Sequence, residues 1–187
     1  MTRIVGGRFG GRRLTTPAGA ATRPTGEKVR AALANALTAA GGLDGARVLD
    51  LYAGSGAIGL ELLSRGARSV VLVDNDHAAI AAIRANVAAL GVDGAVDVVN
   101  GTVAAPRWSQ APADRFDSVV ADPPYDGPTE EVTAVLATLW RAGAVAPGAD
   151  LVVERSVRAG EQSWPEPLTA VRTKRYGDTL LCYGRAP

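Results

Sequence analysis

The segment V-V-A-D-P-P-Y-D-G, residues 119–127, combines residue types that are typical of a rigid, polar strand end. An apolar run stops at Asp122, and Pro123, Pro124 and the aromatic Tyr125 follow it. Each proline fixes its own φ and lacks a backbone N–H, so the run cannot continue as a paired strand. The segment is therefore either a proline-stabilised turn with a capping acid or a backbone held rigid for a ligand.

A glycine-rich turn forms the second pattern. Gly54, Gly56 and Gly59 follow an apolar run with the G-x-G-x-x-G spacing of nucleotide-binding turns. At Gly54 and Gly56 the missing Cβ lets a ligand lie close to the backbone. Asp74 ends the next apolar run, where a carboxylate can accept hydrogen bonds from both hydroxyls of a ribose. The pattern predicts a nucleotide site, although such turns can also serve only to reverse the chain.

Asp50 bears on which nucleotide would bind, because it lies four residues before the first glycine. A carboxylate there would repel the pyrophosphate of a dinucleotide, which prefers a helix N-terminus. It would suit the cationic amino-acid part of S-adenosylmethionine (SAM), favouring the α-ammonium directly or through water, and the sulfonium. The alternative is a carboxylate that braces the turn or caps the helix.

The composition argues against several other chemistries. The 187 residues are 47% hydrophobic, enough for one well-packed domain, and no apolar run approaches the length of a membrane span. Single Cys182 and His77 residues argue against disulfides, cysteine-based zinc sites and histidine-based metal catalysis. The N-terminus lacks the apolar core of a secretory signal. We expect a cytoplasmic monomer that uses no metal and contacts no membrane.

Positive charge gathers at the start of the chain. Residues 1–30 have a net charge of +6, against −5 for the rest. A basic segment on an acidic body predicts a polyanionic partner, because arginines displace counterions from phosphates. A solvated tail is the alternative. Residues 1–21 are expected to form a basic arm or β-hairpin, and residues 22–187 the main domain.

Apolar periodicity predicts helices alternating with buried strands. The expected strands are 46–53, 69–76, 95–101, 116–125 and 149–156, with an antiparallel hairpin over 168–185. The expected helices are 25–40, capped by Thr25, then 57–65, 77–90 and 129–142. Continuous apolar strands between helices indicate an α/β fold with a mostly parallel sheet covered on both faces.

These motifs together resemble a known enzyme family. D-L-Y-A-G-S-G, V-D-N-D and D-P-P-Y are similar, in that order, to motifs I, II and IV of class I SAM-dependent methyltransferases. R-I-V-G-G-R-F-G-G-R-R-L, T-R-P-T and Y-G-D-T-L-L resemble the RsmD family, bacterial guanine-N2 methyltransferases of 16S ribosomal RNA. The resemblance runs over nearly the whole chain.

The resemblance implies a Rossmann-like class I methyltransferase fold, a seven-stranded mostly parallel sheet with helices on both faces and a C-terminal antiparallel hairpin. It implies SAM as cofactor, no metal, and 16S ribosomal RNA or the 30S subunit as partner. The expected cofactor contacts are Asp50, Tyr52, Gly54, Gly56, Asp74, Asn75, Gly101, Thr102 and Val103. The resemblance places Arg23 and Thr25 near the active site, and charge adds Arg3, Arg8, Arg12 and Arg13 as expected RNA contacts. Arg172, Lys174 and Arg175 are expected to hold RNA phosphates too, with the ordinary charges of an exposed turn as the alternative. Many relatives carry an acid in the third loop for the adenine amine, and here Asn100-Gly101-Thr102-Val103 stands instead.

For a family that methylates planar nitrogens, the D-P-P-Y residues take specific roles. The exocyclic amine of guanine is a poor nucleophile because its lone pair is delocalised into the ring. Asp122 and the carbonyl of Pro123 would accept its two N–H bonds and aim the lone pair, while Pro124 helps to fix the backbone. Tyr125 would stack on the extruded base. Whether Asp122 also takes the proton stays open.

Other functions fit fewer of these observations. A DNA adenine-N6 methyltransferase should carry a further target-recognition region, and a protein-glutamine methyltransferase more often has asparagine in place of Asp122. A nicotinamide-dependent oxidoreductase leaves D-P-P-Y unexplained and lacks a substrate domain. A non-catalytic RNA-binding module would not need an intact Asp122–Tyr125 motif.

Overall fold

The computed structural model describes residues 2–17, 24–104, 114–124 and 129–187. Its elements follow in chain order: β1 (Thr2–Arg3), η1 (Gly7–Phe9), β2 (Arg13–Leu14), α1 (Pro24–Ala39), β3 (Arg47–Leu51), α2 (Ala57–Ser64), β4 (Ser69–Asp74), α3 (His77–Leu90), η2 (Asp93–Ala95), β5 (Val96–Asn100), β6 (Phe116–Ala121), α4 (Thr129–Arg141), β7 (Val145–Ser156), η4 (Val157–Ala159), β8 (Thr169–Tyr176) and β9 (Thr179–Arg185).

In the part of the chain that the structure describes, seven strands form one sheet with the order β5-β4-β3-β6-β7-β9-β8. The first five strands of this order are parallel, whereas β9 lies antiparallel between β7 and β8. The order reverses between β3 and β6, and such a switch point opens a crevice at the carboxyl ends of the strands. The sheet confirms the predicted α/β, Rossmann-like fold with its antiparallel C-terminal hairpin.

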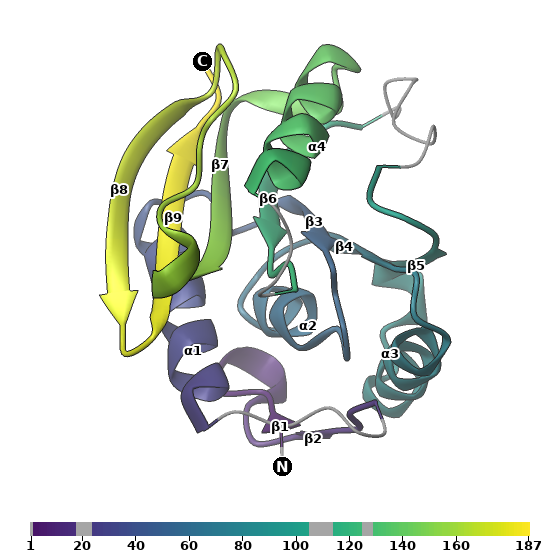
Figure 1. Cartoon of the computed structure of the whole chain (residues 1–187). Helices are drawn as coiled ribbons and strands as arrows, with labels where there is room; N and C mark the ends of the chain where they lie inside the picture. Colours follow the sequence, from purple (N-terminus) through teal and green to yellow (C-terminus); the bar gives the residue numbers. More distant parts are fainter. Residues whose placement is uncertain (1, 18–23, 105–113, 125–128) are drawn as a thin grey trace.

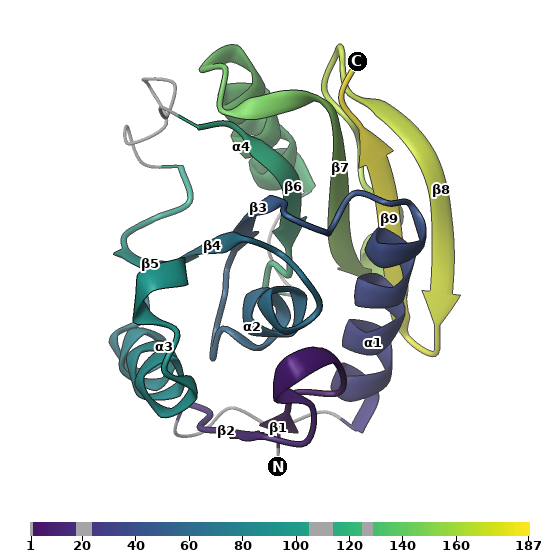
Figure 2. The ribbon, with the colours of Figure 1, turned by 180° about the vertical axis from the view of Figure 1, so that it is seen from behind.

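Helices cover both faces of this sheet (Figures 1 and 2). On one face, α1, α2 and α3 contribute Leu33, Leu60 and Ile83 to a core that includes Val48 of β3. On the other face, α4 packs its apolar side, which includes Leu136, against a second core. Successive strand residues point to opposite faces, so the apolar runs of β3 and β4 contribute to both cores.

Some element boundaries differ from the prediction. Helix α1 begins at Pro24, because proline suits the first helical position, so the expectation that Thr25 caps the helix is wrong. Strand β7 begins at Val145 rather than at residue 149, since its pairing with β6 shifts between Phe116 and Ser118. Pro147 and Gly148 fall within that irregular stretch, and from sequence they indicate a break.

The N-terminal segment, residues 2–17, is docked on the face that α2 and α3 cover (Figure 1). Its strands β1 and β2 pair antiparallel, and Ile4 and Leu14 are buried. The backbone N–H groups of Val5 and Gly6 donate to the two carboxylate oxygens of Glu61, at 2.6 and 2.9 Å. The segment is thus held chiefly through its own backbone.

Candidate active site

A cavity of about 530 Å³ lies at the carboxyl ends of the parallel strands, where β3, β4 and β6 end side by side. Residues from six parts of the chain line it: Thr2, Thr16, Pro17, Gly26, Arg30, Tyr52, Ala53, Gly54, Ser55, Ala57, Ile58, Asp74, Asn75, Asp76, Asp122, Pro123, Pro124 and Glu154. The cavity therefore brings the glycine turn, the end of β4 and the start of D-P-P-Y to one place.

The glycine turn has a left-handed backbone that its residue types permit. Gly54 has φ +58° and Gly56, at the N-terminus of α2, has φ +77°. Tyr52 also has a positive φ, of 59°, and its hydroxyl lies 3.3 Å from Glu131 Oε1. Burial and the neighbouring Glu131 raise the pKa of Tyr52. Tyr52 and Gly54 line the cavity, whereas Gly56 does not.

Gly59, the third glycine, lets α2 lie close to the sheet. A Cβ there would stand 2.4 Å from Leu72 Cδ2 and 3.0 Å from Asp50 Oδ2. Helix–sheet packing therefore requires glycine, the role that the third glycine has in nucleotide-binding turns.

Asp74 holds the turn against the end of β4. Its Oδ2 accepts a hydrogen bond from the Gly54 N–H at 2.8 Å, and its Oδ1 accepts one from the Asp76 N–H at 2.9 Å. Carboxylate oxygens have lone pairs for more than one donor each, so these bonds leave capacity for ligand hydroxyls. Asp74 and Asn75 both line the cavity, as a ribose-binding role requires.

Asp50 lies beneath the turn. Its side chain is fully buried, and Oδ2 accepts a hydrogen bond from the Gly59 N–H at 2.8 Å. It is absent from the cavity lining. Burial raises the pKa of Asp50 to about 8, with smaller contributions from Asp122 and Asp74 and an opposing one from the Gly59 N–H. The carboxyl group braces the turn from below, and its predicted contact with the cofactor stays a prediction.

Asp122, Pro123 and Pro124 follow directly after β6 and line the cavity. The Asp122 N–H donates to the Leu51 carbonyl at 3.3 Å, which continues the β3–β6 pairing by one residue. Pro123 is buried and Pro124 is exposed. Tyr125 lies outside the described residues.

The third loop is separate from the cavity. The Gly101 N–H donates to the Asp74 carbonyl at 2.9 Å, Thr102 is exposed, and Val103 is buried in the core on the α4 face. None of the three lines the cavity, so their predicted cofactor contacts stay predictions.

Several cavity residues were not predicted as site residues, and four of them matter most for the shape and charge of the cavity. Arg30 comes from α1, Glu154 from β7, and Thr16 and Pro17 from the N-terminal segment. Glu154 could have been predicted as a site residue, because it lies near the carboxyl end of β7, the strand that pairs with β6. The others face the cavity through tertiary packing that no local pattern reveals.

The predicted RNA contacts fall into two sets. Arg3, Arg8, Arg12 and Arg13 are exposed on the N-terminal segment, and Arg172, Lys174 and Arg175 are exposed on β8. Arg12 donates to the Ala89 carbonyl, and the Arg172 guanidinium lies 4.6 Å from the centre of the Tyr183 ring. Arg23 lies outside the described residues, as does the side chain of Thr25.

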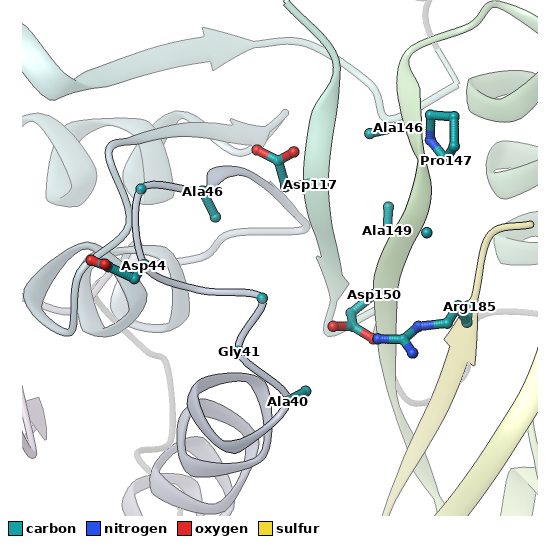
Figure 3. A pocket seen from close by; sticks show the side chains of 13 residues that line it. Ala40, Gly41, Asp44, Ala46, Asp117, Ala146, Pro147, Ala149, Asp150 and Arg185 are labelled. Atoms are coloured by element: carbon teal, nitrogen blue, oxygen red, sulfur yellow. The ribbon is translucent and has the colours of Figure 1, made fainter.

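A second cavity, of about 370 Å³, lies at the amino ends of β3, β6 and β7, opposite the first cavity (Figure 3). Three of its four charged side chains have partners in the protein. Asp150 pairs with Arg185 at 3.0 Å, and Asp117 accepts a hydrogen bond from the Arg47 N–H at 2.8 Å. We therefore place the candidate active site in the larger cavity.

Two other kinds of site are missing from the described ranges. They contain no group of three or more His, Cys, Asp or Glu side chains that could hold a metal ion. In the same ranges, no helix combines the length and apolar character of a membrane span.

Comparisons with known proteins identify the family. A family model described as "Conserved hypothetical protein 95" matches residues 2–185. The Escherichia coli protein named ribosomal RNA small subunit methyltransferase D is 35% identical over 175 residues, which are 94% of this chain and 85% of the relative. The chain belongs to the RsmD family. A Bacillus subtilis relative, named as a candidate rRNA methyltransferase YlbH, is 38% identical over 126 residues, 66% of each chain.

Solved structures agree with membership of the RsmD family. The Escherichia coli protein yhhF, described as a candidate methyltransferase, has a TM-score of 0.84 and 30% identity, covering 98% of this chain and 97% of that one. A magnesium protoporphyrin IX methyltransferase from Synechocystis with bound SAM has a TM-score of 0.65 at 18% identity, over 86% of this chain and 79% of that one, and shows the fold alone. These findings confirm the predicted resemblance: the protein is an RsmD-family, SAM-dependent methyltransferase.

Proposed function

We propose that this RsmD-family chain transfers a methyl group from SAM to the exocyclic N2 of one guanine in 16S ribosomal RNA, as a cytoplasmic monomer acting on the assembled 30S subunit. The observation that carries the proposal is a shared cavity: Asp122 and Pro123 line it together with Gly54 and Asp74. The residues proposed to position the acceptor amine and those proposed to hold the nucleoside line the same cavity.

The cavity lining fits SAM. Asp74, Asp76, Asp122 and Glu154 give it negative charge, which favours a ligand with an ammonium and a sulfonium. Asp74 and Asn75 would hold the ribose and the turn at Gly54 would lie against the methionine part. Bound SAM supplies an electrophilic methyl group and an already activated leaving group.

The chain's own contribution is to position the acceptor amine. The Asp122 carboxylate and the Pro123 carbonyl would accept hydrogen bonds from its two N–H groups, which directs the lone pair toward the cavity. Pro124 restricts the backbone next to that carbonyl. On the sequence alone, Tyr125 is assigned to stacking on the extruded base. Such positioning lowers the barrier without a covalent intermediate.

Cations near the cavity mouth support a nucleic-acid substrate. Across the sheet, Glu154 of the cavity pairs with Leu181, which in turn pairs with Lys174. Lys174 is therefore two strand spacings, about 10 Å, from the cavity wall. Arg3 follows Thr2, another lining residue. Arg8 and Arg12 lie farther away, because Phe9 N–H donates to Ser64 at the end of α2 and Arg12 donates to Ala89 near the end of α3. The cations that support the proposal are therefore Lys174 and Arg3.

The proposal is tested with 30S subunits and naked 16S RNA from a strain that lacks the modification. We expect transfer of labelled methyl groups to RNA, and nucleoside analysis should find N2-methylguanosine at a single position. Transfer only to DNA adenine would favour the DNA-methyltransferase alternative and overturn the proposal. Transfer only to protein would also contradict it.

Two substitutions separate the roles of the acids. Asp122→Ala should lower the transfer rate by about 10²–10³-fold, because an acceptor for the amine is lost, while calorimetry shows cofactor affinity retained. Asp74→Ala should instead raise the cofactor Kd first. If both variants changed only cofactor affinity, Asp122 would not position the acceptor amine.

A further inference from the structure

Arg30 is a buried arginine that faces the candidate active site. It lies in α1, its residue is 6% exposed, and it lines the same cavity as Gly54 and Asp122. Arginine is rarely buried unless its donors are paired. The identity of its partners therefore indicates whether its role is only structural.

The partners found among the described residues do not use all of its donors. One terminal nitrogen donates to the Arg3 carbonyl. Nε is buried without a hydrogen-bond partner, and it lies 3.7 Å from Glu61 Oε2, beyond hydrogen-bond length. A guanidinium carries five N–H donors in a planar fork, so within the described ranges Arg30 is underused. Burial lowers the pKa of Arg30, an effect that Glu61 and Glu27 oppose.

Glu61 does not serve Arg30 alone. Its oxygens accept hydrogen bonds from the Val5 and Gly6 N–H groups, and Arg65 Nε lies 2.6 Å from Oε1. The carboxylate is thus shared between two backbone donors and two arginines. Arg65 differs from Arg30 in one respect that matters here: it does not line the cavity.

The charge of the cavity also points to a role for Arg30. Among the described lining residues, Arg30 is the one cation, against Asp74, Asp76, Asp122 and Glu154. SAM is a mixed ligand, with two cationic groups and a carboxylate that these acids would repel. Ala57 and Ile58, the first residues of α2, line the same cavity, and a helix N-terminus favours an anion. Among the described lining residues, favourable charge for the carboxylate therefore lies on this side.

We propose that Arg30 binds the carboxylate of the methionine part of SAM. The inference rests on the proposed function, because it takes SAM as the ligand of this cavity. It adds a binding residue from α1 to the strand-end residues that the motifs indicate. It also explains a buried guanidinium whose Nε has no hydrogen-bond acceptor among the described residues.

The test compares SAM with decarboxylated SAM, which keeps the sulfonium and the amine but lacks the carboxylate. Calorimetric titration of the wild-type protein should give a Kd for SAM that is about 10- to 100-fold lower than the Kd for decarboxylated SAM. This is the usual effect of a charged hydrogen-bonded pair. In Arg30→Met this preference should fall by at least about tenfold. The acidic lining then favours the analogue, whose net charge is more positive.

Arg65→Met is the matched control. Both substitutions remove one arginine from Glu61 and leave the other, but only Arg30 faces the cavity. Arg65→Met should keep the wild-type preference for SAM, and thermal unfolding of both variants reports their stability. Equal binding of the two ligands by the wild-type protein would overturn the inference even if Arg30→Met failed to fold. If the wild-type protein bound neither ligand, that result would instead contradict the proposed function.

Discussion

The Asp50 carboxyl group is unusual because it combines complete burial with a single hydrogen-bond donor. Gly59 N–H occupies Oδ2, and Oδ1 has no partner among the described residues. Burial raises the pKa from 3.8 to about 8, and the charges of Asp122 and Asp74 add to the shift. At neutral pH the folded protein therefore holds a proton that an unfolded chain would release.

This proton makes a prediction for stability. Between pH 4 and 8 the folded state binds one more proton at Asp50 than the unfolded state does. The free energy of unfolding should therefore fall as pH rises through this range, by at most about 1.4 kcal/mol per pH unit from this group. Denaturant unfolding of wild type and Asp50→Asn at pH 5, 6, 7 and 8 measures the effect. If the free energy of unfolding of Asp50→Asn fell with pH as steeply as that of the wild type, Asp50 would not be the source of the effect.

Single residues were predictable where strand ends fixed their place. Asp74 and Asp122 follow apolar runs, and the carboxyl ends of parallel strands meet at one edge, so their meeting in one cavity could be expected. Asp50 lies inside a strand, where successive side chains point to opposite faces of the sheet. A shift of one residue would therefore change which face its side chain points to, and the sequence does not fix that position. Arg30 was treated as part of the basic segment, because its burial depends on how the segment and α2 pack around it.

Asn86 shows how one helix fixes two other elements. From α3, its side-chain amide donates to the carbonyls of Thr15 and Ser55, both at 2.9 Å, and its oxygen accepts the Thr15 N–H at 2.7 Å. Ser55 belongs to the glycine turn, and Thr16 and Pro17 line the cavity. Asn86 therefore holds two walls of the cavity in a fixed relation.

Loss of this bridge should affect stability and binding together. Asn86→Ala should lower the free energy of unfolding by about 2 kcal/mol, since three hydrogen bonds disappear and part-buried backbone groups of Thr15 and Ser55 lose their partner. It should also raise the SAM Kd. Asn35→Ala is the control, because the Asn35 amide is exposed on α1 and accepts from Arg65 only. Denaturant titration and calorimetry report both effects, and equal effects of the two substitutions would refute the assigned role.

Elements were easier to predict than their docking. Apolar periodicity located the helices and strands within a few residues, and the terminal hairpin followed from its turn. The sequence left open whether residues 1–21 form a loose arm or a hairpin. The reason is that residues 2–17 are held by backbone N–H groups that donate to Glu61, Ser64 and Asn86. Backbone donors are the same in every residue type, so they leave no side-chain pattern.

At the scale of the whole molecule, basic side chains lie both at the carboxyl ends of the parallel strands, which we call the cavity edge, and at their amino ends, which we call the opposite edge. Tyr176 pairs with Thr179, and Thr179 pairs with Ser156 at the end of β7, so the basic end of β8 shares the cavity edge. Arg68 precedes β4 and Arg141 ends α4, which places both at the opposite edge together with Arg185. Substitutions can therefore test separately how the cations at each edge contribute to RNA binding.

Binding of 16S RNA should depend on salt mainly through the cavity edge. Replacing Arg172, Lys174 and Arg175 with glutamine should reduce the slope of log K against log salt by about 2 to 3, one unit for each lost phosphate contact. The same replacement of Arg68, Arg141 and Arg185 should leave the slope unchanged. Filter binding over a range of potassium chloride concentrations measures both. Equal slopes for the two triple variants would show that β8 does not contact phosphate.

Strand β8 is the outer strand of the sheet next to β9, and most of its eight residues are exposed, including Val171 at 57%. An open strand of this length presents backbone groups to which another chain can add, the usual route to intermolecular β-aggregation. Lysine and arginine on such a strand oppose this, because like charges from two copies would meet. The cations assigned to RNA would then also keep copies of the protein apart, and engineering that neutralises them should be followed by light scattering.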